Sequence, residues 1–261
     1  MLAEIGIIGG TGIYDSQFLT NAKEIQMNTP YGSPSDVVTV GELGSRKVAF
    51  IPRHARKHTI RPTDVNYRAN IYALKQLGVQ WILSPSTVGS LREEFKPGDL
   101  VFVDQFIDRT TRREESFYVS PKVCHISVAE PTCPDLRRLL ARIAEEMNID
   151  HHKSGTYVCI EGPRFSTRAE SNLFRSWGAH VVGMTLVPEC VLAREAEICY
   201  ASIATVTDYD VWKDHPVTAG EVAKTMRQNV EKVKKLIKEA VQRIPEERTC
   251  ECKSALRSAM V

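Results

Sequence analysis

An alternation of short apolar runs with longer segments of helical periodicity constrains the fold of this chain more than any other feature. The apolar runs are typical of buried strands, and they fall at 5–8, 48–51, 81–83, 100–103, 180–183 and 202–206. Apolar residues recur at helical spacing between several of these runs, at 66–74, 136–147 and 220–243. Strands that alternate with helices predict an α/β fold with a mixed, mostly parallel central sheet flanked by helices.

A single domain accounts for the length of the chain. Its 261 residues suffice to bury one large core. No internal repeat, low-complexity tract or linker interrupts the sequence before about Glu246. We therefore expect one domain over residues 1–245, followed by a C-terminal tail over residues 246–261.

The charge balance excludes several classes of protein. Charged residues make up 25% of the chain and the formal net charge is +2, which argues against a nucleic-acid-binding protein and against a disordered one. No apolar run approaches the roughly 20 residues of a membrane-spanning helix. The first residues also lack the basic flank and cleavage site of a signal peptide. We expect a cytoplasmic protein without nucleic-acid or membrane partners.

The first predicted strand runs into a glycine-rich loop, Gly9-Gly10-Thr11-Gly12. Asp15 stands where a dinucleotide-binding loop would have its third glycine, and the sequence of a Walker loop is absent. The loop can still offer backbone N–H groups and the Thr11 hydroxyl to a small anion. A tight turn between a strand and a helix explains the glycines equally well.

Hydroxyl and cationic groups follow four of the predicted strands. Ligands of parallel α/β sheets bind beyond the carboxyl ends of the strands, and a guanidinium beside hydroxyls is suited to an oxyanion. Exposed basic residues are common, but one phosphate site explains all four strand ends more economically than four coincidences. The predicted phosphate ligands are Thr11, Arg53, His54, Ser86, Thr87 and Thr185.

Metal coordination is the alternative function for His54 and His58, which are four residues apart. The acid that stands between two such histidines in zinc proteases is absent here. We therefore predict no metal site.

An acidic pair in Thr207-Asp208-Tyr209-Asp210 follows the last predicted strand. Alternate residues of a strand point to the same side, so both carboxyl groups would face one site if the strand continued. Two close carboxyls do not both ionise easily, and one of them can then donate a proton to a ring nitrogen. A plain turn and a calcium site are the alternatives, but calcium needs more oxygen ligands than this segment supplies.

The seven cysteines allow two interpretations. Buried, reduced thiols are the ordinary case in an intracellular chain. Cys250 and Cys252, however, lie close together in a polar tail where packing does not require them. Because paired metal ligands usually have about two to four residues between them, this spacing argues against zinc and favours a strained, redox-active or protective disulfide. Intracellular disulfides are expected in hyperthermophiles.

Five motifs, taken together and in order, resemble the S-methyl-5′-thioadenosine phosphorylase family over roughly residues 4–243. They are Gly6-Ile7-Ile8-Gly9-Gly10-Thr11-Gly12, Arg53-His54-(x3)-His58-Thr59, Asp104-Gln105-Phe106-Ile107-Asp108-Arg109-Thr110, Glu161-Gly162-Pro163-Arg164-Phe165 and Thr207-Asp208-Tyr209-Asp210. The resemblance implies a nucleoside phosphorylase type of α/β fold, with inorganic phosphate as co-substrate and no metal or organic cofactor. It also implies the phosphate ligands predicted above.

The resemblance further assigns the nucleoside contacts. Asp208 would be the catalytic residue and would face purine N7, while Asp210 would bind the 6-amino group. The remaining contacts that it implies are Met184 at the ribose, Phe165 and Ser166 at the base, Val217 and Ala219 at the 5′-methylthio group, and His58 and His125 lent by a neighbouring subunit of a homotrimer or homohexamer.

Two departures and one shared feature qualify this resemblance. Ala219 stands where eukaryotic members have a larger apolar side chain, so adenosine or other nucleosides could also fit. The segment 84–88 is less rich in threonine than is usual in the family. The Cys-x-Cys tail is shared with some hyperthermophilic archaeal members, which form disulfide-stabilised hexamers. By that analogy Cys250 would pair with Cys252, and Cys133 with Cys199.

We predict an enzyme that uses phosphate to convert S-methyl-5′-thioadenosine to adenine and 5-methylthioribose 1-phosphate in purine and methionine salvage. Adenosine is a further candidate substrate. One alternative is a 6-oxopurine nucleoside phosphorylase, for which an amide rather than a carboxyl would be expected at position 208. The other alternative is a nucleoside-binding protein without turnover.

Overall fold

The central feature of the fold is a mixed β-sheet. The computed structural model describes residues 2–10, 18–213 and 219–261. Over these residues the strands are β1 (Ile5–Gly9), β2 (Thr20–Ile25), β3 (Val38–Leu43), β4 (Arg46–Pro52), β5 (Trp81–Ser90), β6 (Leu100–Phe102), β7 (Gln105–Arg109), β8 (His151–His152), β9 (Thr156–Ile160), β10 (Val181–Gly183) and β11 (Cys199–Asp208). The helices are α1 (Tyr67–Leu77), α2 (Pro134–Glu146), α3 (Arg168–Ser176), α4 (Glu189–Glu195) and α5 (Ala219–Arg243), with short 3₁₀ helices η1 (Pro62–Asp64) and η2 (Glu251–Ser254).

Parallel pairing dominates the middle of the sheet. The main path runs β2-β3-β4-β1-β5-β10-β9-β7, and β11 pairs with both β5 and β6. β1 is parallel to β4 and β5, and β5 is parallel to β11. The antiparallel pairs join β2 to β3, β3 to β4, β6 to β11 and β10 to β5. The predicted mixed, mostly parallel sheet is therefore confirmed.

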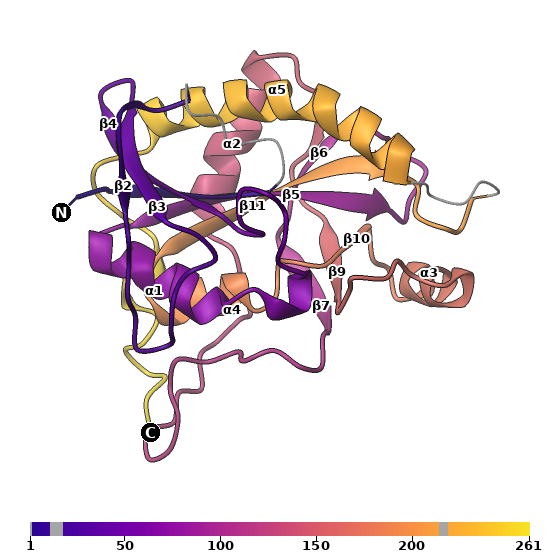
Figure 1. Cartoon of the computed structure of the whole chain (residues 1–261). Coiled ribbons are helices and arrows are strands. Elements are labelled where there is room, and N and C mark those ends of the chain that lie inside the picture. The colour runs from indigo at the N-terminus through magenta and orange to yellow at the C-terminus, as the bar shows by residue number, and fades with distance from the viewer. Residues whose placement is uncertain (1, 11–17, 214–218) are drawn as a thin grey trace.

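Helices cover both faces of this sheet, as Figure 1 shows. α2 and α5 pack on one face, where buried side chains such as Leu140 and Ile237 meet Phe102 and Leu83 of the sheet. α1 and α4 pack on the other face, where Leu74 and Leu192 belong to a second apolar cluster. Two apolar layers thus hold the strands rigidly, which fixes the positions of the groups at their carboxyl ends.

Among the described strands, β2, β3, β7, β8 and β9 were not predicted from the sequence, and β5 is longer than predicted. β5 was expected to end near Ser84, but it continues to Ser90 because it pairs with β11 along almost its whole length. β2 was not expected, since nearly all of its side chains are exposed and it has no apolar alternation. Tertiary pairing rather than local sequence therefore sets both strands.

The C-terminal residues pack against the rest of the chain instead of forming a loose tail. Cys252 and Ala259 are buried. The carbonyl of Ala259 accepts a hydrogen bond from the His125 N–H, and an isolated bridge joins Cys124 to Met260. Figure 1 shows the C-terminus beside the projecting segment between β7 and α2. Within the described ranges, no helix is both long and apolar enough to cross a membrane.

The two expected disulfides are absent, and this part of the sequence prediction is wrong. All seven cysteines are free thiols. The Sγ atom of Cys250 lies 3.7 Å from that of Cys133 and 3.2 Å from that of Cys199, whereas a disulfide bond is about 2.05 Å long. The C-terminal residues pack beside the starts of α2 and β11, which brings Cys250 next to Cys133 and Cys199. The spacing of Cys250 and Cys252 in the sequence could not reveal these two neighbours.

Candidate active site

A cavity of about 450 Å³ opens at the carboxyl ends of the central strands. Its walls come from the ends of β1, β4, β5, β9, β10 and β11 and from the loops that follow them. The residues that line it are Gly10, Arg53, His54, His58, Pro62, Ser86, Thr87, Val88, Gly89, Ile160, Pro163, Phe165, Ser166, Val182, Gly183, Met184, Thr185, Thr207, Asp208 and Asp210.

Arg53 is the principal cation of this cavity, and it is almost completely buried. Its Nε and Nη2 atoms donate to the two oxygens of Glu189 at 2.7 and 3.0 Å, and Nη2 also donates to Ser84 Oγ at 2.7 Å. Burial alone would lower the pKa of Arg53, but the Glu189 carboxylate more than offsets this and raises it. The guanidinium is therefore charged and fixed in one orientation.

One edge of Arg53 remains for a ligand. Among the described residues, Nη1 makes a single hydrogen bond, to the Pro85 carbonyl at 3.3 Å, although this nitrogen carries two N–H groups. Nη1 is also the atom of Arg53 that lies nearest to Gly10. The hydroxyl-bearing residues Ser86 and Thr87 line the same cavity, so this end can hold a small oxyanion.

His54 lies beside Arg53 as a neutral imidazole. Burial, reinforced by the charge of Arg53, lowers the pKa of His54 to about 4. Its Nδ1 atom is 2.9 Å from the Ile60 carbonyl, so at neutral pH Nδ1 carries the proton and Nε2 is left as an acceptor. The ring of His58 stacks at a tilt on that of His54, with 4.7 Å between the centroids.

The two acids of the sequence prediction line the same cavity, but a turn rather than a strand brings them together. β11 ends at Asp208, and Asp210 adopts a left-handed backbone conformation with φ of 50°. Asp208 Oδ1 accepts a hydrogen bond from the Asp210 N–H at 2.8 Å, and Asp208 Oδ2 accepts one from the Thr207 hydroxyl at 2.7 Å. Both carboxyl groups nevertheless face one cavity, as predicted.

Asp210 is the acid whose protonation the fold favours. Burial raises its pKa, and the charge of Asp208 acts in the same direction. Its Oδ2 atom is buried and has no hydrogen-bond partner of good geometry in the described part of the chain. The neighbouring Ser166 Oγ is likewise buried without such a partner. Two unsatisfied polar atoms on one wall indicate a site for a polar ligand edge.

Two glycines keep the cavity open. A Cβ atom on Gly89 would lie 3.0 Å from Asp208 Oδ1 and so displace this carboxyl. A Cβ atom on Gly183 would lie only 2.1 Å from the Tyr157 hydroxyl oxygen, which in turn accepts from the Thr185 N–H. The close approach of backbone and side chain at these positions therefore requires glycine.

Arg113 fixes the wall that carries Met184. Its buried guanidinium donates to the carbonyls of Met184 and Glu161, both at 2.7 Å, and to the Glu161 carboxylate at 3.1 Å. Burial alone would raise the pKa of Glu161, but a hydrogen bond from the Thr111 N–H and the contact with Arg113 hold it at about 2. An ionic clamp thus joins the loops after β9 and β10.

The structure gathers most of the predicted site residues into this cavity. Those that line it are Arg53, His54, Ser86, Thr87, Thr185, Met184, Phe165, Ser166, Asp208, Asp210 and His58. His58 was expected from a neighbouring subunit, but it lines the cavity of its own chain. His125 does not line the cavity and is exposed on the projecting segment. Thr11 and Val217 lie outside the described residues, and the side chain of Ala219 at the start of α5 is also outside them.

Comparison with known proteins agrees with this arrangement. Residues 4–242 match the Phosphorylase superfamily. The S-methyl-5′-thioadenosine phosphorylase of Thermofilum pendens is 59% identical over 99% of this chain and 98% of its own length, and that of Pyrococcus furiosus is 54% identical over the full length of both chains. The chain belongs to the S-methyl-5′-thioadenosine phosphorylase family.

Solved structures of this phosphorylase family have the same fold. A methylthioadenosine phosphorylase from an Antarctic soil metagenomic library superposes with a TM-score of 0.95 at 46% identity, covering 99% of this chain and 92% of the other. A variant of the adenosine/methylthioadenosine phosphorylase of Schistosoma mansoni, in complex with methylthioadenosine, superposes with a TM-score of 0.92 at 40% identity, covering 98% and 96%. The expected nucleoside phosphorylase fold is confirmed.

Sequence reasoning missed two residues that position this phosphorylase site, Glu189 and Arg113. Glu189 is the more surprising, because it is completely buried and also accepts from the hydroxyls of Ser84 and Tyr200. An acid within the apolar stretch 186–193 was the available signal, since a buried carboxylate needs a cation. No comparable local signal marks Arg113, whose partners are mostly carbonyls.

Proposed function

We propose that this chain is a pentosyltransferase that cleaves S-methyl-5′-thioadenosine with phosphate, giving adenine and 5-methylthioribose 1-phosphate. The observation that carries the proposal is the presence, in one cavity, of both an oxyanion site around Arg53 and the two acids Asp208 and Asp210. The family relationship agrees with it. Adenosine is a further candidate substrate.

Phosphate binds at the Arg53 end. The free edge of Nη1 and the hydroxyl groups of Ser86, Thr87 and Thr185 donate to its oxygens, and neutral His54 accepts from its remaining O–H group. Because Glu189 already neutralises Arg53, the site orients the anion as much as it attracts it. Phosphate held beneath C1′ stabilises the positive charge that develops on the ribose and then attacks that carbon with inversion.

The base binds at the acidic end. In the free enzyme the fold favours protonation of Asp210. With the purine bound we place this proton on Asp208, which donates it to N7 as the glycosidic bond lengthens and negative charge accumulates on adenine. Asp210 accepts a hydrogen bond from the 6-amino group, and the exposed ring of Phe165 stacks on the purine. Bound substrate excludes water from the pair, so one shared proton is stabilised there. The reaction needs no metal or organic cofactor.

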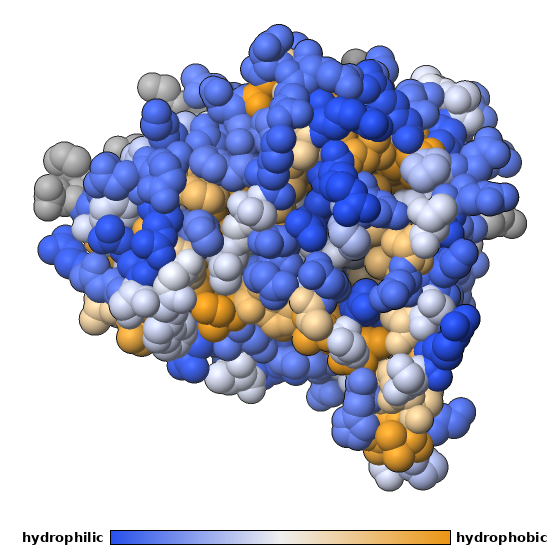
Figure 2. All heavy atoms as spheres, turned by 180° about the vertical axis from the view of Figure 1, so that it is seen from behind, coloured by the Kyte–Doolittle hydropathy of each residue, from blue (hydrophilic) through white to orange (hydrophobic). Residues whose placement is uncertain are grey.

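A homotrimer or homohexamer completes this site. His125 is exposed on the projecting segment, away from the cavity of its own chain. Large apolar side chains nearby are also exposed, and Figure 2 shows hydrophobic residues gathered at the tip of the projection. Such a patch is typical of a protein–protein contact. We place His125 of each chain at the 5′ end of the sugar in its neighbour's site.

Exchange of the catalytic acid tests the base assignment. Asp208→Asn cannot donate the proton to N7 but can bind a 6-oxopurine, so we expect kcat/KM for S-methyl-5′-thioadenosine to fall about 10²- to 10⁴-fold while that for inosine falls much less. Steady-state assays on both nucleosides at one phosphate concentration give the comparison. Faster turnover of inosine than of S-methyl-5′-thioadenosine by the unmodified enzyme would instead support a 6-oxopurine nucleoside phosphorylase.

A further inference from the structure

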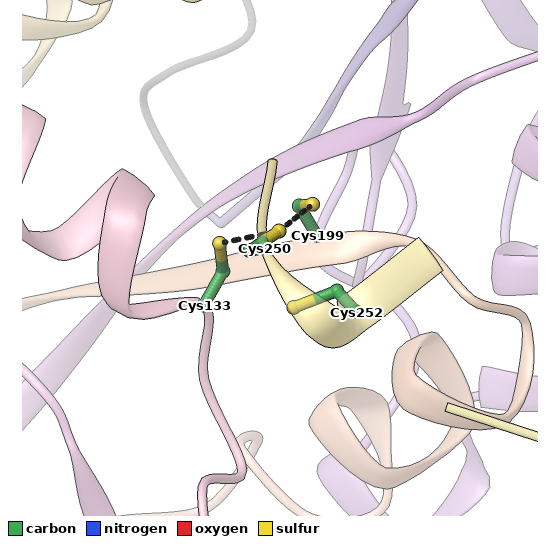
Figure 3. A group of neighbouring side chains, drawn as sticks. All are labelled: Cys133, Cys199, Cys250 and Cys252. Atoms are coloured by element: carbon green, nitrogen blue, oxygen red, sulfur yellow. Dashed lines mark hydrogen bonds between the residues drawn. The ribbon is translucent and has the colours of Figure 1, made fainter. Parts of the chain in front are cut away.

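Four thiols from distant parts of the sequence converge outside the active site. Cys133 is the N-cap residue of α2, Cys199 is the first residue of β11, and Cys250 and Cys252 lie at the N-cap and second position of η2. Their Sγ atoms all lie within 4.8 Å of one another, and Figure 3 shows the four side chains turned toward a common centre. None of them lines the substrate cavity.

The spacing of these sulfurs suits a metal ion better than a disulfide. A tetrahedral zinc ion holds its thiolates at about 2.3 Å, which places the sulfurs about 3.8 Å apart. Cys250 lies 3.7 Å from Cys133 and 3.2 Å from Cys199. Side-chain movements of up to about 1 Å would bring the four sulfurs, which all lie within 4.8 Å of one another, to this regular geometry.

The surroundings also favour thiolates. Cys133, Cys199 and Cys252 are buried, and Cys250 is half-buried. The guanidinium of Arg194 lies with Nη1 4.0 Å from Cys252 Sγ and so adds positive charge beside the cluster. A positive charge beside a thiol stabilises its thiolate, which is the form that binds metal.

We propose that Cys133, Cys199, Cys250 and Cys252 bind one zinc ion as a structural tetrathiolate site. Each of the four thiols loses its proton to solvent and forms one S–Zn bond, so Zn²⁺ plus four thiols give a dianionic complex and four protons, with no change of oxidation state. Four protein ligands leave no open position, which is the pattern of a structural rather than a catalytic zinc site. In the sequence alone, the Cys-x-Cys spacing argued against zinc, because it was considered without Cys133 and Cys199, the two other proposed ligands.

The ion would fasten the C-terminal residues to the core. Cys250 and Cys252 come from the C-terminal segment 246–261, whereas Cys133 and Cys199 begin a core helix and a core strand. Binding energy of a structural metal adds to the stability of the folded state. We therefore expect removal of zinc to lower the thermal midpoint while leaving the chemistry of the separate substrate cavity intact.

Metal content tests the proposal directly. The enzyme is expressed with zinc, purified under reducing conditions and dialysed against metal-free buffer. Inductively coupled plasma mass spectrometry should then find about one zinc ion per chain. Apoenzyme reconstituted with Co²⁺ should show the intense visible absorption of a tetrahedral thiolate complex. The zinc content per chain of C250S/C252S should be at least about tenfold lower than that of the unmodified enzyme, and this variant should lose the cobalt spectrum. Cys124→Ser, which changes a thiol outside the cluster, should alter neither the zinc content nor the cobalt spectrum.

Three results would overturn the zinc site. One is seven free thiols in native enzyme that takes up neither Zn²⁺ nor Co²⁺. Another is an intact mass lowered by two or four hydrogens, which would show that the cluster is oxidised to disulfides instead. The third is zinc that persists in C250S/C252S. Because the metal measurements on unmodified enzyme need no variant and no turnover, they decide the question even where the double variant fails to fold or the proposed reaction is wrong.

Discussion

At the scale of single residues, the end of the cavity proposed to bind phosphate depends on a buried ion pair. Arg53 and Glu189 are both almost inaccessible to solvent, and their two hydrogen bonds are short. Removing one member of such a pair leaves an uncompensated buried charge, which costs about 3–5 kcal/mol. The anion that the site binds is the natural substitute for the lost carboxylate.

This ion pair leads to a prediction about phosphate and stability. Glu189→Gln should unfold at a lower temperature than the unmodified enzyme, and added phosphate should raise the thermal midpoint of the variant by more than it raises that of the unmodified enzyme. The reason is that phosphate then compensates the charge of Arg53 as well as binding to it. Thermal unfolding with phosphate, with chloride at equal ionic strength as the salt control, measures the effect.

Glu195→Gln is the matched control for this experiment. Glu195 lies on the same helix and is also buried, but it bonds to Ser116 and to the Phe117 N–H and not to Arg53. Its response to phosphate should equal that of the unmodified enzyme. An equal phosphate response in both variants would show that Arg53 does not contact the anion.

The neutral state of His54 gives the stability of the protein a pH dependence. Its pKa is about 4 in the fold against 6.5 for an ordinary histidine, so between these values only the unfolded state binds the proton. The stabilisation is complete above pH 6.5 and is lost as the pH falls toward 4. The stability advantage of the unmodified enzyme over His54→Gln should narrow by about 3 kcal/mol over this range. Urea unfolding at both ends of the range measures it, and a constant difference would contradict a neutral His54.

At the scale of elements, the sequence predicted six of the strands but missed others, among them β3 and β9, although these also have buried apolar side chains. β1, β4, β10 and β11 lie where apolar runs indicated them. β5 is longer than its apolar core because β11 continues beside it, and β2 has no apolar signal because it is an exposed edge strand. Asp208 and Asp210 were correctly predicted to face one site, but a left-handed turn at Asp210, rather than the alternation of a strand, brings their carboxyl groups together.

The same limit applies to the site. Glycines, hydroxyls and cations at strand ends could be read from the sequence, since all of them follow predicted strands. Glu189 and Arg113 could not be assigned to the site, because the ion-pair partner of Glu189 lies 136 residues away along the chain and that of Arg113 lies 48 residues away. Long-range contacts of this kind depend on the topology of the sheet and not on local spacing.

The tight contact between β9 and β10 gives a prediction at this scale. Gly183→Ala places a methyl group against the Tyr157 ring and hydroxyl, whose nearest atom would be 2.1 Å from the new Cβ. We expect a loss of about 1–3 kcal/mol of stability from overpacking. Chemical denaturation measures it, and Gly10→Ala is the control, because within the described ranges its Cβ would meet no atom closer than 3.8 Å. Equal stability of the two variants would contradict the close packing.

At the scale of the whole molecule, the projecting segment and the C-terminal residues form one unit that presents apolar side chains. Val123 and Met260 are exposed, at 45% and 43%, and the Val261 N–H donates to the Val123 carbonyl. Monomeric proteins rarely leave such a projection uncovered. Its proposed role is to contact a neighbouring chain and to deliver His125.

A charged residue on this projection should disrupt assembly. Val123→Asp places a carboxylate in the proposed contact, so sedimentation velocity should show smaller species than the trimer or hexamer proposed for the unmodified enzyme, together with a higher KM for S-methyl-5′-thioadenosine. Leu173→Asp is the control, since Leu173 is equally exposed, at 46%, but lies on α3. An unmodified enzyme that sediments as a monomer and is fully active would refute the shared site.

The central claim is that phosphate, not water, breaks the glycosidic bond of an adenine nucleoside. The most direct measurement incubates the enzyme with S-methyl-5′-thioadenosine and isotopically labelled phosphate and quantifies adenine and labelled sugar phosphate together. We expect the two products in equal amounts, and no adenine when phosphate is omitted. Adenine released without phosphate, or without label in the sugar product, would show a hydrolase and contradict the account.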